Sequence, residues 1–129
     1  MSNYIELEDY DRKLIDDSLR NMMKENDRSG SGTREELTRK YYQDINVTLF
    51  ELRLKIQSPD LDSKKYKDLS LSDLKLIKSC LLGLDDSNHQ KSLVEQDEIE
   101  YYKRCKLQMS ALLEKISAME QHTMYSGLL

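Results

Sequence analysis

Apolar residues recur with a helical period along the last long segment of the chain. Between residues 92 and 121 the sequence contains neither glycine nor proline. Its apolar positions advance by alternating steps of three and four, at Tyr102, Cys105, Met109, Leu112, Ile116 and Met119. Such a heptad pattern places apolar side chains in one seam along a helix, and a seam of this kind requires a partner to cover it. We therefore expect a long helix over residues 92–121 with an apolar seam, capped at its start by Ser92 and Glu95.

A second long helix is predicted over residues 33–57. Thr33 and Glu36 have the spacing of a capping box at its start, and Pro59 lies just beyond its end. Its apolar stripe consists of Leu37, Tyr41, Ile45, Leu49, Leu52 and Ile56. A flanking row is expected to widen the buried face and consists of Tyr42, Phe50 and Leu54.

Two shorter helices complete the predicted set. The first covers about residues 4–24, and the other covers residues 72–82, where Gly83 is placed to end the helix in a left-handed cap. Residues 26–32 contain glycines and serines and nothing apolar, so they are predicted to form a flexible linker.

These patterns predict an all-α fold of about four helices. The two long helices, roughly 33–57 and 92–121, are expected to run antiparallel with a coiled-coil-like seam, and the shorter helices are expected to pack alongside. The predicted organisation is an N-terminal helix at 1–25, the linker at 26–32, a helical bundle or hairpin domain at 33–124 and a tail at 125–129.

Composition supports helices and disfavours sheets. Hydrophobic residues make up 38% of the 129 residues and charged residues 34%, a balance typical of thin amphipathic helices with much solvated surface. Valine occurs only twice, and there are 4 glycines and 1 proline, too few for a sandwich or barrel with many turns.

Charge and hydropathy limit the classes of partner. The 20 basic and 24 acidic residues are interspersed, so no basic stripe is present and direct nucleic-acid binding is disfavoured. No apolar run approaches 18 residues, so no membrane insertion is expected. The acidic N-terminus does not resemble an import signal, and Cys80 and Cys105 are interpreted as buried thiols. We expect an intracellular protein, cytoplasmic or nuclear.

The sequence contains no clear catalytic or metal site. Cys80 lies on an apolar helix face, where a reactive thiolate is disfavoured, and His89, His122, Cys80 and Cys105 lack metal-ligand spacing. The triplet beginning at Asn46 matches a glycosylation signal, but it falls within a predicted helix and is attributed to chance. We therefore expect no enzyme activity and no cofactor.

A binding surface is the remaining functional feature. The candidate partner-binding residues are Tyr102, Met109, Leu112, Leu113, Ile116 and Met119. The alternative is that the helix over 33–57 covers this seam within the chain. The leading hypothesis is a non-enzymatic helical subunit that docks on other protein subunits, in a homo- or hetero-oligomer. The alternative function is a self-contained regulatory or adaptor domain switched by phosphorylation near Ser58, Ser70 or Ser72.

Overall fold

The described part of the chain is built from helices. A computed structural model describes residues 7–57 and 69–126. Its elements in chain order are α1 (Asp9–Ser31), α2 (Glu36–Gln57), α3 (Leu71–Val94), the single 3-10 turn η1 (Gln96–Glu98) and α4 (Ile99–Ser126). No strand occurs within these two ranges. The predicted all-α class, with four α-helices that pack on one another, is confirmed.

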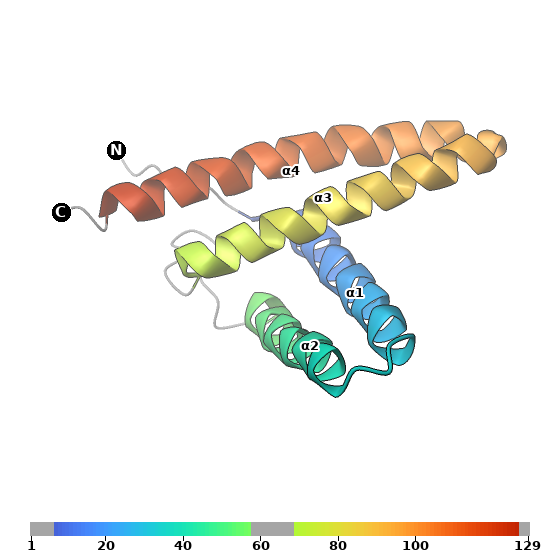
Figure 1. The fold of residues 1–129 in the computed structure, drawn as a ribbon. Coiled ribbons are helices and arrows are strands. Elements are labelled where there is room, and N and C mark those ends of the chain that lie inside the picture. The colour runs from blue at the N-terminus through green and yellow to red at the C-terminus, as the bar shows by residue number, and fades with distance from the viewer. Residues whose placement is uncertain (1–6, 58–68, 127–129) are drawn as a thin grey trace.

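The helices form two antiparallel hairpins (Figure 1). Helices α1 and α2 make one hairpin, while α3 and α4 make the longer one, and α1 crosses α3 where the two hairpins meet. The distal half of the α3–α4 hairpin, with η1 at its tip, extends beyond the α1–α2 hairpin. This arrangement leaves a corner between α1 and the distal half of the longer hairpin.

The pairing of the long helices differs from the predicted pairing. The helix expected at 92–121 was paired with the helix expected at 33–57, whereas α4 packs along α3 and makes no extended contact with α2. The physical reason is the length of α3. This helix runs from Leu71 to Val94, about twice the predicted span, and therefore offers α4 a continuous surface.

Gly83 was predicted to end this helix, but it lies within α3. A Cβ atom built at Gly83 would lie 3.5 Å from the Cε atom of Met22 in α1. Met22 of α1 therefore packs beside α3 at this position, at a distance that is ordinary for van der Waals contact. Because α3 continues, the predicted capping box at Ser92 and Glu95 is not formed: the Ser92 hydroxyl donates to the His89 carbonyl oxygen at 2.7 Å, and Glu95 is the residue that ends α3.

The predicted flexible linker at 26–32 is helical as far as Ser31. Two residues of this segment are buried against α2: Asn26, which is 7% exposed, and Gly30, where a Cβ atom would lie 3.7 Å from the Cβ atom of Tyr42. These contacts hold the last turns of α1 in place despite their low helix propensity. The connection between α1 and α2 is therefore short, and the Thr33 hydroxyl accepts from the Glu35 amide at 3.2 Å rather than from Glu36.

One hydrophobic core joins all four helices. Its buried members in the helices are Leu14, Ile15 and Leu19 from α1, Leu49, Leu52 and Ile56 from α2, Leu74, Ile77, Cys80 and Leu81 from α3, and Met109, Leu112, Ile116 and Met119 from α4. Helix α1 thus shares its core with the other helices rather than standing apart on a tether. Burying one large apolar side chain contributes about 1.5–3 kcal/mol, so this cluster is the main source of stability.

Ion pairs join the helices around this core. Their nitrogen–oxygen distances run from 2.7 to 3.6 Å, and the pairs are Asp16–Arg53, Asp73–Lys55, Asp11–Lys115 and Glu120–Lys78. Each pair joins a different couple of helices, so together they restrict sliding of one helix past another.

Candidate functional site

The predicted partner-binding seam of α4 lies inside the molecule. Met109, Leu112, Ile116 and Met119 are 0–1% exposed, and Leu113 is partly buried against the same core. Helix α3 packs along α4 and covers this seam, and the Asp11–Lys115 pair joins the first turn of α1 to α4 beside it. The chain therefore covers its own seam, although through α3 rather than through the helix at 33–57.

Tyr102, the sixth of these residues, lies near the hairpin tip. Its hydroxyl donates to a carboxylate oxygen of Glu95 at 2.6 Å, and this hydrogen bond raises the pKa of Tyr102 to about 12. The contact joins the start of α4 to the end of α3. Tyr102 is thus separated from the four core residues and helps to hold the tip of the hairpin.

Helix α2 carries an apolar row on its outer face. Val47, Phe50 and Leu54 follow steps of three and four and are 57%, 48% and 54% exposed. They lie opposite the buried row of this helix. Phe50 and Leu54, which were predicted to widen the buried face, are instead solvent-exposed, because the core takes only the later positions of the predicted stripe. Leu37 and Tyr41, at the start of that stripe, are also exposed. The sequence feature that could have identified this surface is a second row of apolar residues on the same helix, also spaced by steps of three and four.

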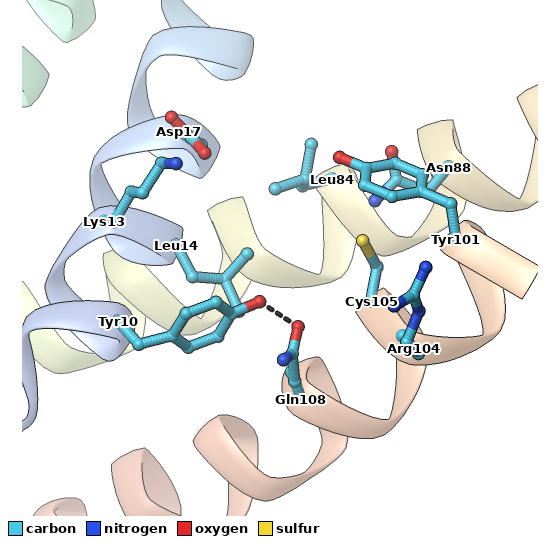
Figure 2. Close-up of a pocket in the computed structure, with 10 residues that line it drawn as sticks. All are labelled: Tyr10, Lys13, Leu14, Asp17, Leu84, Asn88, Tyr101, Arg104, Cys105 and Gln108. Carbon is cyan, nitrogen blue, oxygen red and sulfur yellow. Dashed lines mark hydrogen bonds between the residues drawn. The ribbon is translucent and has the colours of Figure 1, made fainter.

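A cavity of about 360 Å³ opens at the corner between α1, α3 and α4 (Figure 2). Its lining combines polar and charged groups with apolar surface and consists of Tyr10, Lys13, Leu14, Asp17, Leu84, Asn88, Tyr101, Arg104, Cys105 and Gln108. The Tyr10 hydroxyl donates to the side-chain oxygen of Gln108, and this hydrogen bond joins α1 to α4 at one end of the cavity. Away from this hydrogen bond α1 and α4 separate, and α3 lines the cavity between them.

A second hollow of about 450 Å³ continues along α1. It shares Asp17 and Leu84 with the first cavity and adds Arg20, Asn21, Met23, Lys24, Asp27 and Arg53. The two hollows are therefore adjacent along α1, which lines both, and Leu84 of α3 belongs to the lining of each. We call the two hollows together the α1 groove. No local sequence pattern predicted it, because it arises where the two hairpins diverge.

The α1 groove carries unpaired positive charge. Lys13, Lys24 and Arg104 make no ion pair with another described residue, whereas Arg53 is held by Asp16 at 2.7 Å. Two carboxylates, Asp17 and Asp27, also line the groove, and Asp27 accepts a hydrogen bond from Asn46 at 2.9 Å. Cations therefore outnumber anions on this surface.

The phenols of Tyr10 and Tyr101 near this groove are protonated at neutral pH. Burial, together with the neighbouring groups Cys105, Asp11 and Asp17, raises the pKa of Tyr10. Hydrogen bonding to Cys105 is the main cause that raises the pKa of Tyr101. Both cysteines are free thiols: Cys80 is buried, as predicted, whereas Cys105 is half-buried and faces the cavity (Figure 2).

Two further observations concern the described residues only. No three side chains of the metal-ligating kinds lie together within residues 7–57 and 69–126. None of the helices in this part of the chain combines the length and apolarity needed to cross a membrane.

Comparison with known proteins identifies no relative. No protein-family model, curated protein sequence or solved structure matches this chain significantly.

Proposed function

We propose that this chain is a non-enzymatic helical subunit of a protein complex and acts through helix–helix contacts. The observation that carries the proposal is the outer row of α2, where Val47, Phe50 and Leu54 are about half exposed. A helix with apolar rows on two opposite faces can pack on its own chain with one face and on a partner helix with the other. The seam of α4 supplies stability within the chain, and the outer row of α2 supplies the contact to another subunit.

The chemistry of the side chains supports a binding role over catalysis. Burial raises the pKa of Cys80 to about 11, so this thiol is protonated at neutral pH and is a poor nucleophile. The pKa values of Tyr10 and Tyr101 are also raised, so neither phenol serves as a base near pH 7.

The size of the chain in a native cell extract tests this function. The purified chain has a mass of 15.2 kDa. We expect an epitope-tagged chain in an extract of its source cells to sediment as a larger species. We expect the double variant Phe50→Asp/Leu54→Asp to return to the size of the free chain, because buried carboxylates oppose apolar docking.

The matched control adds the same two charges to polar positions of the same helix. Gln43 and Thr48 are both exposed in α2, so Gln43→Asp/Thr48→Asp should leave the larger species intact. Circular dichroism of both purified variants checks that α2 still folds. Sedimentation of the unmodified chain at its own mass would contradict the proposal.

A second candidate function is regulation by phosphorylation, and the geometry at Ser70 favours it. The Ser70 hydroxyl accepts from the Asp73 amide at 3.0 Å, and Asp73 in turn binds Lys55 of α2 at 3.0 Å. A phosphate on Ser70, at the start of α3, would add negative charge beside Asp73 and compete for Lys55, which would change the ion pair between α2 and α3. Ser72 is exposed in the first turn of α3, while Ser58 lies outside the described residues.

Mass spectrometry of the chain purified from its source cells tests this second candidate. Phosphate on Ser70 or Ser72 would support it. A phosphorylated chain with the same unfolding midpoint as the unmodified chain would contradict a switch at this position.

A further inference from the structure

The α1 groove combines an elongated shape, an apolar floor and an excess of positive charge. A binding role for this groove rests on the proposed function of the chain as an interaction subunit, and it narrows the class of partner protein. The residues that line α1 recur with steps of three and four, at Tyr10, Lys13, Asp17, Arg20, Lys24 and Asp27. From Tyr10 to Lys24 this wall is about 21 Å long at 1.5 Å per residue. This length matches about four turns of a docked helix.

We propose that the α1 groove binds an acidic amphipathic helix of a partner protein. Leu84 lies on the floor of both hollows, and Met23 and Leu14 add apolar surface on either side, so a ligand needs one apolar row. Lys13 on α1 and Arg104 on α4 line the first hollow (Figure 2), and Lys24 on α1 lines the second. Carboxylates on both flanks of a helix would meet these cations.

The charge of the groove differs from that of the whole molecule. The chain has a net charge of −4, yet the groove presents three cations that are free of ion pairs among the described residues. Complementary charge steers association and excludes partners of the same sign. The apolar floor disfavours a nucleic-acid backbone, which offers phosphates but no apolar row.

A designed peptide pair tests the inference with the full chain. The probe is a fluorescein-labelled 18-residue helical peptide in which glutamates flank a row of leucines, and its twin has lysine in place of every glutamate. Fluorescence anisotropy should show binding of the acidic peptide and at least tenfold weaker binding of the basic one. We expect Lys13→Glu/Lys24→Glu/Arg104→Glu to weaken binding of the acidic peptide by about tenfold or more, because it replaces three attractions by repulsions.

The control variant makes the same change of charge outside the groove. Arg34, Lys40 and Lys75 are exposed and make no ion pair with another described residue, so Arg34→Glu/Lys40→Glu/Lys75→Glu should change binding by less than about twofold. If the groove variant fails to fold by circular dichroism, the neutral variant Lys13→Gln/Lys24→Gln/Arg104→Gln replaces it, with an expected loss in the same direction.

Cys105 reports where the peptide binds. Its half-buried thiol lines the groove, whereas Cys80 is 0% exposed. Bound acidic peptide should slow maleimide labelling of Cys105 severalfold and leave the slow labelling of Cys80 unchanged.

Four results would overturn the inference: equal binding of both peptides, equal losses in the groove and control variants, unchanged labelling of Cys105, or displacement of the peptide by a single-stranded oligonucleotide. None of them bears on the sedimentation experiment, so the groove and the proposed function can fail separately.

Discussion

The side-chain amide of Asn26 in α1 donates a hydrogen bond of 2.9 Å to the side-chain oxygen of Asn46 in α2. The amide of Asn46 donates in turn to the Met23 carbonyl oxygen at 3.2 Å and to a carboxylate oxygen of Asp27 at 2.9 Å. Asn26 is 7% exposed, so this network lies at a buried helix–helix contact. Satisfied polar groups in such a place fix the register of the two helices, because any slide leaves them without partners. The same bonds occupy the nitrogen that glycosylation at Asn46 would need.

Replacement of Asn46 by alanine should therefore destabilise the chain. The change leaves Asn26 and the Met23 carbonyl without this partner, which costs about 1–3 kcal/mol. Urea unfolding followed by circular dichroism measures the loss. Thr48→Ala, two residues away on the exposed face, is the control and should cost under about 0.5 kcal/mol. Equal costs for the two variants would show that the network does not contribute to stability.

Gly83→Ala should stabilise the chain by about 0.5–1 kcal/mol. Gly83 lies inside α3, where alanine is the better helix former, and its new Cβ atom would meet Met22 Cε at an ordinary contact distance of 3.5 Å. The sign of this change in stability is informative, since an alanine at a left-handed cap position would destabilise the chain instead. Thermal unfolding measures it, and a lower midpoint would place the end of a helix at Gly83.

The glycines explain why the sequence predicts the helices better than their ends. The apolar periods identify the stretches that become α1 to α4, because periodicity records which face is buried. The ends depend on contacts with distant residues, such as Met22 beside Gly83 and Tyr42 beside Gly30. Local propensity assigns both glycines to breaks, and tertiary packing overrides it.

A single apolar stripe also does not reveal which helix covers it. The pattern from Met109 to Met119 requires a cover but is the same whichever helix supplies it, and α3 does so. The α1 groove is still less predictable, because it depends on the angle at which two hairpins meet. Phe50 and Leu54 of the outer row of α2 were recognised as apolar positions in the sequence. Their exposure could not be predicted, because a helix with one wide buried face and a helix with two opposite apolar faces have similar sequences.

Leu52 and Leu54 should respond very differently to truncation. Leu52 is 3% exposed in the core and Leu54 is 54% exposed on the outer face of the same helix. Leu52→Ala should cost about 2–5 kcal/mol, because it removes buried methyl groups and leaves a cavity. Leu54→Ala should cost under about 1 kcal/mol in the isolated chain. Chemical unfolding of the two variants compares them directly, and similar costs would show that the outer row is covered within the chain.

Cys80 should make the chain less stable at alkaline pH. Burial raises the pKa of its thiol from 9.0 to about 11, which means that the folded chain holds the proton more tightly than the unfolded chain. The stabilisation is fully present below pH 9 and is lost as the pH rises to about 11, where the folded chain must also ionise the buried thiol. At 1.36 kcal/mol for each unit of pKa, the loss amounts to about 2–3 kcal/mol.

Urea unfolding at pH 7.5, 9 and 10.5 measures this dependence. Cys80→Ala should be less stable than the unmodified chain at pH 7.5, because it leaves a small cavity, but its stability should fall less between pH 9 and 10.5. Cys105→Ala is the control, and its stability should fall as steeply as that of the unmodified chain, since Cys105 is only half-buried and Cys80 is still present. Tyrosines and lysines are the same in all three proteins, so the difference between the slopes isolates Cys80. An equally steep fall in Cys80→Ala would mean that this thiol is not buried in the folded chain.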